Sequence, residues 1–388
     1  MTGRALKPGI DVLLSRHRSW LTGRRVGLVG HQAAVDQWGC AAAERLWRDP
    51  DVELTCLLGP EHGFFGRAGA GVACAHARHA SWRIPIYSLY GARRRPTPAM
   101  LRRVDALVVD LQDLAVRCYT YVSTLKLVLE AAAEADKEVI VADRPVPLPR
   151  TVDGPVTAPG AESFVAAVET PLCYGMTPGE TALWIRDRYA PAARVRVAPM
   201  SGYHRAAAPP PGAPPWVPPS PGIATWEAAA CYPATVCFEA LGAVDHGRRT
   251  RLPFQVFGAR WMHGADMAEA LTDAGLPGVA FYAHPYDARP YDRDPAPLDG
   301  VRMVLTRPHA FRPARTAVTI VATLQRLYGK RRVWNVRTSR PGFFDQLFGT
   351  PAVREALLDG EAPDAIVARW RSGLSRFRRQ REKVLLYS

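Results

Sequence analysis

The chain has 388 residues, a formal net charge of +14 and an ordinary hydrophobic content of 48%. At this length we expect about two domains with sizeable cores. No apolar run reaches about 18 residues, which excludes a membrane-spanning helix. The charged first twenty residues lack the apolar core of a secretory signal, so we expect a cytoplasmic protein. The positive charge is nearly all arginine, spread along the chain without a nucleic-acid-binding motif, so we expect no nucleic-acid partner.

The first half of the chain alternates short apolar runs with helical patterns. We predict strands at 25–30, 52–58, 84–90, 105–110 and 138–143. Helices are predicted at 41–47, 123–136 and 177–189, with a short one closing at 101–103. The last long helix begins with Thr-Pro-Gly-Glu, which resembles a capping box. Strands that alternate with helices imply right-handed βαβ units and a parallel sheet, so the fold class is α/β.

A proline-rich segment at 206–222 interrupts both kinds of pattern, because so many prolines exclude a helix and a central strand. We predict it to be an extended domain boundary, or else an ordered loop that crosses the active site, which Trp216 favours. The second half has an α+β texture, with a strand at 301–306 and a helix at 317–328. The region 369–383 predicts an amphipathic helix with a basic outer face.

Seven cysteines are scattered along the chain, and no two of them form a C-x-x-C pair. Several lie in apolar runs, where a free cysteine behaves as a small hydrophobic residue. We therefore expect reduced core cysteines, and neither a disulfide framework nor a zinc site. The cysteines are Cys40, Cys56, Cys74, Cys118, Cys173, Cys231 and Cys237.

The stretch LLGPEHGFFG places Glu61 and His62 directly after the predicted strand at 52–58. Glycines on both sides let the backbone turn sharply and approach a ligand closely. A charged pair at the carboxyl end of a buried strand lies where open α/β folds bind their ligands. The alternative is a turn with a solvated glutamate and histidine.

A second polar group follows the strand at 105–110. Asp110, Gln112, Asp113 and Arg117 precede Tyr119 and Tyr121, and all of these residues fall in one turn region. Carboxylates and amides bind hydroxyl groups, aromatic faces stack on sugar rings, and arginine pairs with a carboxylate or phosphate, so the group suits a sugar. The alternative is that the tyrosines belong to the core and Arg117 to a structural ion pair.

Asp143 and Arg144 repeat this pattern after the strand at 138–143. If the three strands are neighbours, Glu61, Asp110 and Asp143 should converge on one crevice. Converging carboxylates can hold one group protonated and one ionised, which glycoside hydrolysis requires. Glu239, which we place at the end of a strand-like run 234–238, could reach the same cleft or be an exposed strand-end residue.

Together these motifs resemble the NamZ-type exo-β-N-acetylmuramidases, which are bacterial peptidoglycan-recycling glycosidases. The resemblance extends nearly end to end, and it implies a Rossmann-like N-terminal domain, a smaller C-terminal α/β domain and a cleft between them. We place these parts at 1–207 and 223–388, with a linker or loop at 208–222. The resemblance further implies removal of a terminal N-acetylmuramic acid without a metal or organic cofactor. The matching segments include LLGPEHGFFG, IPIYSLYG, DLQDLAVRCYTYVSTL, VIVADRP, YGMTPGE, PFQVFGA and FRRQREKVLLY.

The resemblance implies that Glu61 is the general acid/base. Its carboxylate partner would be Asp110 or Asp113, with Glu239 less favoured, and Arg117 or Arg248 would pair with the lactyl carboxylate. The remaining candidates for substrate binding are His62, Gln112, Tyr119, Tyr121, Asp143, Arg144 and Tyr174.

The chain departs from the usual family residues at several positions that we expect in cleft loops, which predicts a modified pocket. It therefore stays open whether the protein is a hydrolase or a non-hydrolytic relative that binds a sugar or muropeptide. A dinucleotide-dependent enzyme is not expected, because the turn 27–34 lacks G-x-G-x-x-G. The departures are His31, Ala33, Ala34, Val146, Cys173, Tyr174, Gly222 and the run 240–242.

Overall fold

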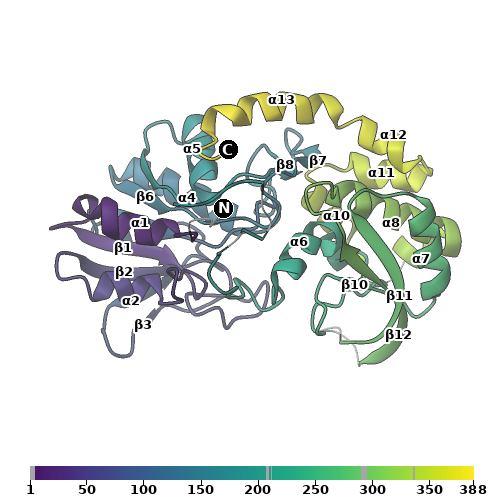
Figure 1. Ribbon diagram of the computed structural model, residues 1–388, viewed down its shortest axis with the longest axis horizontal. Coiled ribbons are helices and arrows are strands. Elements are labelled where there is room, and N and C mark those ends of the chain that lie inside the picture. Colours follow the sequence, from purple (N-terminus) through teal and green to yellow (C-terminus); the bar gives the residue numbers. More distant parts are fainter. Residues whose placement is uncertain (1–4, 207–208, 211, 290–294, 335–336) are drawn as a thin grey trace.

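The computed structural model describes residues 5–206, 209–210, 212–289, 295–334 and 337–388, arranged in two lobes (Figure 1). The N-terminal lobe contains a seven-stranded sheet in the order β3-β4-β2-β1-β5-β6-β9. All neighbouring pairs are parallel except β3 with β4. Without β3 the order is that of a Rossmann-like sheet, as the resemblance implied. The strands are β1 (Arg25–Gly30), β2 (Glu53–Gly59), β3 (Ala77–Arg78), β4 (Pro85–Ser88), β5 (Ala106–Asp110), β6 (Glu138–Ala142) and β9 (Arg194–Ala198).

Helices cover both faces of this sheet, which is why β5 and β6 are buried at every position. Apolar side chains of α1 and α2 pack on one face, and those of α4 and α5 pack on the other. The capping box predicted at Thr177 is confirmed, with reciprocal hydrogen bonds to Glu180 at the start of α5. The helices of this lobe are α1 (Gly9–Arg16), α2 (Ala42–Trp47), α3 (Pro98–Leu101), α4 (Tyr121–Glu134) and α5 (Pro178–Tyr189).

The C-terminal lobe is built on a three-stranded antiparallel sheet, β10-β12-β11, and a set of helices. Its long helix α8 is buried along most of one side. The strands are β10 (Val256–Phe257), β11 (Val279–Ala288) and β12 (Ala296–Leu305), and a hairpin of β7 (Asp153–Val156) and β8 (Pro171–Cys173) packs beside α8. The helices are α6 (Trp226–Thr235), α7 (Gly264–Asp273), α8 (Pro313–Tyr328), α9 (Lys330–Trp334), α10 (Pro341–Phe348), α11 (Ala352–Asp359), α12 (Pro363–Ala368) and α13 (Arg371–Arg381).

Helix α13 runs along the top of Figure 1 and returns the chain to the N-terminal lobe. Phe377 packs against Trp184 of α5, with ring centroids 4.9 Å apart. Beyond α13, the backbone N–H of Leu386 donates to Glu180, and the hydroxyl of Tyr387 donates to Asp143 at 2.6 Å. The end of the chain therefore fastens the two lobes together behind the cleft described below.

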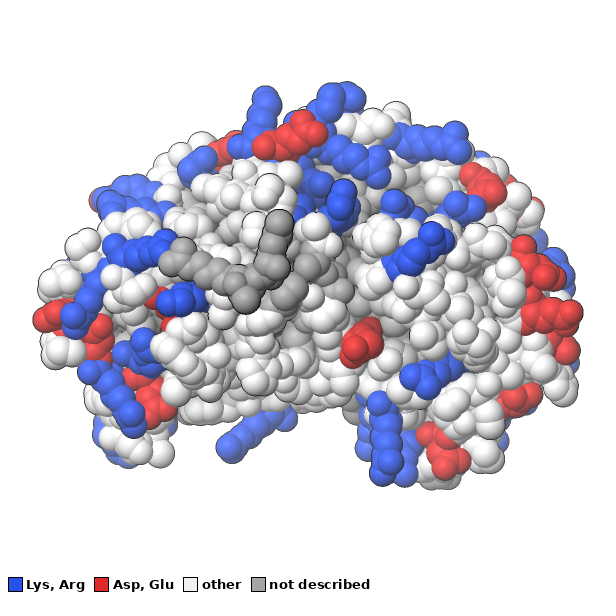
Figure 2. Space-filling model, in the orientation of Figure 1, with Lys and Arg blue, Asp and Glu red and all other residues white. Residues whose placement is uncertain are grey.

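The basic outer face predicted for the last helix is present. Figure 2 shows lysine and arginine side chains spread over this face of the molecule, with several along the edge that α13 forms. The expected lack of a nucleic-acid partner stays a prediction. All seven cysteines are free thiols, and five of them are buried. Within the described ranges, no helix has the length and apolar character needed to cross a membrane.

Candidate functional site

A cleft of about 810 Å³ lies between the two lobes. Small-molecule sites usually measure roughly 300–1,000 Å³, so this space can hold a sugar with part of its aglycone. Segments that follow β2, β4 and β5 form one side, and α6, α10 and the loop before β10 form the other. Its polar and charged lining includes Glu61, His62, Arg94, Tyr119, Thr120, Glu239, Arg248, Arg340 and Gln346.

Glu61 enters the cleft from the turn that follows β2. The turn is tight, since a Cβ on Gly59 would lie 2.3 Å from the backbone nitrogen of Phe64. Gly71 donates its N–H to Oε1 of Glu61 at 2.8 Å, and Thr120 donates its hydroxyl to Oε2 at 2.6 Å. Within the described part of the chain no cationic side chain pairs with Glu61. The carboxyl group is thus oriented by neutral donors.

His62 is held in an unusual backbone conformation beside Glu61. Its φ of 71° lies in the left-handed region that non-glycine residues rarely adopt. Its Nδ1 lies 2.8 Å from the carbonyl oxygen of Ala68, so Nδ1 carries a proton and Nε2 is the acceptor of the neutral ring. Burial lowers the pKa of His62, which keeps the ring neutral. His62, which lines the cleft, therefore has Nε2 available as a hydrogen-bond acceptor.

Glu239 reaches the cleft from the C-terminal lobe. It lies in a short 3-10 helix, Val236–Ala240, so the predicted strand end is wrong, and its side chain is 19% exposed. Arg248 donates from Nη1 to Oε1 of Glu239 at 2.7 Å. Burial raises the pKa of Glu239, Arg248 and Arg340 oppose this rise, and Glu61 adds to it. Two carboxyl groups from separate lobes therefore act on one another across the cleft.

Aromatic rings form the walls around these charges. Tyr119 packs edge-on against Tyr232, with ring centroids 5.8 Å apart, and Tyr232 packs in the same way against Phe254 at 4.9 Å. Tyr90 and Phe164 contribute a further pair on the N-terminal side. Carboxylates surrounded by aromatic faces form an arrangement suited to a sugar.

The expectation that Asp110 shares this cleft is wrong. Asp110 is fully buried at the end of β5, where its carboxylate forms an ion pair with the buried guanidinium of Arg144. Arg144 also donates to the carbonyl oxygen of Val35. Asp110 and Arg144 therefore join the loops after β1, β5 and β6 inside the lobe.

Asp143 is equally remote from the cleft. Its carboxylate accepts hydrogen bonds from the Thr177 hydroxyl, the Gly179 N–H and the Tyr387 hydroxyl, at 2.6 to 2.7 Å. Burial and the neighbouring Glu180 raise the pKa of Asp143 to about 7. The group anchors the end of the chain and the first turn of α5, and it does not face a substrate.

Three further candidates for the site form hydrogen bonds inside the protein and do not line the cleft. Asp113 accepts a hydrogen bond from the Tyr174 hydroxyl at 2.6 Å, and burial raises its pKa to about 6. The Gln112 amide donates to the carbonyl oxygens of its neighbours Asp113 and Pro145. Tyr121 is buried, and its hydroxyl donates to Pro219 at 2.7 Å.

Arg117 does not face a substrate either, because its side chain is completely buried. Its guanidinium donates to the carbonyl oxygens of Pro155, Thr170 and Leu347, and Leu347 belongs to α10 of the other lobe. The structural alternative weighed for Arg117 therefore holds, although its partners are carbonyl groups and not a carboxylate. Of the residues proposed from the sequence, the structure brings Glu61, His62, Tyr119, Glu239 and Arg248 together in the cleft.

Most of the family departures are buried residues outside the cleft lining. His31, Val146 and Tyr174 are buried, and none of the departing positions belongs to the cleft lining that the structure describes. Nε2 of His31 accepts a hydrogen bond from the backbone N–H of Gln112, which connects the loops that follow β1 and β5. Gly222 lies against the wall of the cleft, because a Cβ there would be 3.3 Å from the side chains of Arg248 and Phe254. The expectation of a modified pocket therefore stays a prediction.

The proline-rich segment takes part in the site through its last residues. Pro218 and Pro219 accept hydrogen bonds from Gln32 and Tyr121, and Ser220 lines the cleft. The indole N–H of Trp216 donates to Ile223. The alternative of an ordered loop beside the active site therefore holds for this described stretch.

Tyr90, Arg94 and Phe164 line the cleft and were missed from the sequence. Tyr90 and Arg94 follow β4, the third parallel strand to deliver residues to this edge. For Arg94 the available signal was a polar residue shortly after a predicted strand, and nothing local in the sequence distinguishes Tyr90 or Phe164.

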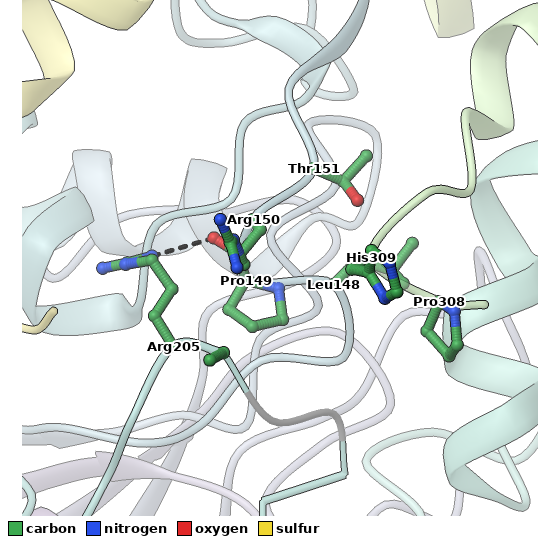
Figure 3. Close-up of a pocket in the computed structure, with 8 residues that line it drawn as sticks. Leu148, Pro149, Arg150, Thr151, Arg205, Pro308 and His309 are labelled. Carbon is green, nitrogen blue, oxygen red and sulfur yellow. Dashed lines mark hydrogen bonds between the residues drawn. The ribbon is translucent and has the colours of Figure 1, made fainter. Parts of the chain in front are cut away.

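A second hollow lies between the lobes and is far smaller. It measures about 50 Å³ and is lined by Leu148, Pro149, Arg150, Arg205 and His309 among others (Figure 3). Arg205 is held there by a hydrogen bond to the carbonyl oxygen of Pro149. This volume suits one or two water molecules and excludes a sugar. Among the described residues, no cluster of three or more His, Cys, Asp or Glu side chains could hold a metal ion.

Comparison with known proteins agrees with this geometry. Two protein-family models match the chain: "Exo-beta-N-acetylmuramidase NamZ, N-terminal" over residues 26–227 and the corresponding C-terminal model over residues 230–387. The peptidoglycan β-N-acetylmuramidase NamZ of Bacillus subtilis (strain 168) is 33% identical over 383 residues, covering 98% of this chain and 91% of that protein. A crystal structure of a DUF1343 family protein from Bacteroides fragilis NCTC 9343 superimposes with a TM-score of 0.92, 32% identity and 99% coverage of both chains. A second DUF1343 structure from that organism gives a TM-score of 0.77 at 26% identity, again with 99% coverage of both chains.

Proposed function

This chain belongs to the NamZ family of exo-β-N-acetylmuramidases, and we propose that it removes a terminal N-acetylmuramic acid from the non-reducing end of peptidoglycan fragments. One observation carries the proposal. Glu61 and Glu239 come from different lobes, line the same cleft and influence one another electrostatically. A pair of carboxyl groups is what most glycoside hydrolases use to reach an oxocarbenium-like transition state.

The family motif leads us to assign different roles to the two groups. Glu61 occupies the position that the resemblance gives to the general acid/base, so we assign it the protonation of the leaving oxygen, and the Gly71 N–H and the Thr120 hydroxyl orient its carboxyl group. Burial raises the pKa of Glu239, and the ion pair with Arg248 opposes this rise and so supports the ionised form. We assign Glu239 the second role, which is attack on the anomeric carbon or activation of a water molecule.

The rest of the cleft supports a sugar substrate. Tyr119, Tyr232 and Phe254 offer aromatic surface to a sugar ring, and neutral His62 offers an acceptor to a hydroxyl group. The cleft keeps the family residues Glu61, His62, Glu239 and Arg248. This favours the hydrolase over the non-hydrolytic relative.

Purified protein with a chromogenic β-N-acetylmuramide tests the proposal. We expect the wild type to release free sugar, and Glu61→Gln and Glu239→Gln each to lower kcat by about 10²- to 10⁴-fold. Glu134→Gln, on the exposed outer side of α4, is the matched control and should keep full activity. Equal rates for the wild type and Glu61→Gln would sink the proposal.

Two further measurements define the reaction. NMR of the first-formed anomer shows whether the second carboxylate acts as nucleophile or as base. Calorimetry with N-acetylmuramic acid and muropeptides tests the alternative, a non-hydrolytic relative. Tight binding without turnover would identify a binding protein.

We also propose that the protein acts in the cytoplasm on recycled cell-wall fragments. This part rests on the family resemblance, since the family is known for recycling. Cell fractionation with detection of the native protein tests it, and recovery outside the cytoplasmic fraction would contradict it.

A further inference from the structure

Three arginines line the cleft, and two of them are already engaged with Glu239. Arg248 donates to its carboxylate at 2.7 Å, and Arg340 donates from Nη2 to its backbone carbonyl at 2.9 Å. The third, Arg94, lies in the loop between β4 and α3 on the opposite side. Among the described residues no carboxylate forms an ion pair with it. Arg94 is thus the cleft cation available to an incoming anion.

Aromatic rings position the Arg94 side chain. Its guanidinium carbon lies 4.2 Å from the ring centroid of Phe164 and 5.6 Å from that of Tyr90. Stacking of this kind holds the guanidinium plane while its N–H groups keep their capacity to donate. Less side-chain entropy is then lost when a ligand binds, so the site is prepared in advance.

Arg94 also lies close to the proposed acid. Glu61 and Arg94 both act on the hydroxyl of Tyr90, where burial raises the pKa to about 12, Glu61 adds to the rise and Arg94 opposes it. Glu61 and Arg94 therefore both lie near Tyr90, and all three line the cleft. An anionic group on the sugar whose glycosidic oxygen meets Glu61 would come within reach of Arg94.

We propose that Arg94 binds the carboxylate of the substrate and thereby selects a muramic acid over an uncharged N-acetylhexosamine. This inference rests on the proposed function and names the group that sets its sugar specificity. The 3-O-lactyl ether of N-acetylmuramic acid carries such a carboxylate, and a stem peptide on that ether carries the same chemistry. The charge balance agrees, because the described lining holds three arginines against two glutamates. Of the two cations proposed for this role from the sequence, Arg117 is completely buried and Arg248 is paired with Glu239.

The test compares ligands that differ only in charge. Calorimetry measures the affinity of N-acetylmuramic acid and of its neutral methyl ester for the wild type, Arg94→Gln, Arg94→Lys and Arg93→Gln. Arg93 is an exposed neighbour outside the cleft lining and is the matched control. We expect the wild type and Arg93→Gln to prefer the acid by about 10- to 100-fold, the strength of a charge-assisted contact. Arg94→Gln should lose this preference, and Arg94→Lys should keep part of it.

Kinetics and a third ligand complete the design. With the chromogenic muramide, Arg94→Gln should raise KM by a similar factor with little change in kcat, the signature of lost ground-state binding. If only the affinity for a muramyl dipeptide responds to Arg94→Gln, the carboxylate recognised is that of the peptide. An acid preference that survives in Arg94→Gln, or is missing from the wild type, overturns the inference. A wild type that prefers the acid but cleaves no muramide contradicts the proposed function alone.

Discussion

The molecule has two groups of carboxylates, one inside the N-terminal lobe and one in the cleft, and they differ in what surrounds them. Asp110 and Asp143 are fully buried, and their oxygens meet donors fixed by the fold, including Arg144, Thr177 and Tyr387. Glu61 and Glu239 face a cleft of about 810 Å³ and approach each other from separate lobes. Both Asp110 and Glu61 lie at or just beyond the end of a parallel strand.

Position at a strand end therefore does not distinguish a structural carboxylate from one that meets a substrate. Whether the carboxylate lines the cleft does, because Asp110 and Glu61 each accept two hydrogen bonds from the fold. A buried carboxylate with its acceptor sites filled ties loops together, and it loses this role if one partner is removed. A carboxylate that faces a solvent-filled hollow keeps acceptor sites for a ligand. The following substitutions test this distinction.

The largest effect on stability is expected for Asp110→Ala. The substitution leaves the buried guanidinium of Arg144 without its counter-ion, which should cost about 3–5 kcal/mol of unfolding free energy. The exposed pair between Arg95 and Glu134 is the control, and Glu134→Ala should cost less than about 1 kcal/mol. Denaturant unfolding measures both. The folded Asp110→Ala protein should retain kcat, and a stable but inactive variant would make Asp110 catalytic and break the comparison.

A smaller effect is expected for Gly59→Ala, on the cleft side of the comparison. The added Cβ would lie 2.3 Å from the backbone nitrogen of Phe64, so the turn that carries Glu61 must shift. We expect a loss of about 1–3 kcal/mol in stability and a fall in kcat/KM. Gly342→Ala is the control, because a Cβ there meets nothing within 4 Å. Unchanged hydrolysis by Gly59→Ala would show that the placement of Glu61 does not depend on this turn.

The sequence predicted the fold well because the fold follows local patterns. Apolar runs bounded by turns located β1, β2, β4, β5 and β6, and their alternation with helices specified the parallel sheet. The two-residue β3 has no such pattern. Strand β9 has the sequence RVRVA, in which arginines alternate with small apolar residues, and its edge position explains why it is not continuously apolar.

The site was predicted only in part, because its distinguishing property depends on contacts between distant segments. Nothing near Asp143 in the sequence shows that Tyr387 will donate to it, since the partner lies at the other end of the chain. Arg117 likewise finds Leu347 in the other lobe. The motif around Glu61 was informative because its glycines and its charged pair are contiguous.

The smallest effect expected here concerns His31, which belongs to the buried side of the comparison. Burial, with Arg144 and His62 adding to it, lowers the pKa of His31 to about 3. In the unfolded chain this pKa is about 6.5, so protonation favours unfolding. The stability that depends on neutral His31 is therefore complete above pH 6.5 and decreases as the pH falls towards 3. At pH 5.5 the loss should be about 1.4 kcal/mol.

His31→Asn removes this titration while it keeps an oxygen that can accept the N–H of Gln112. Unfolding free energies measured between pH 7.5 and 5 should fall less steeply for the variant than for the wild type. His204→Asn, at an exposed position, should leave the slope unchanged. Part of the acid dependence will persist in His31→Asn, because burial and Arg248 lower the pKa of His246 to about 3 as well. Identical slopes for the wild type and His31→Asn would mean that the ring is protonated in the folded protein, which its acceptor role towards Gln112 does not allow.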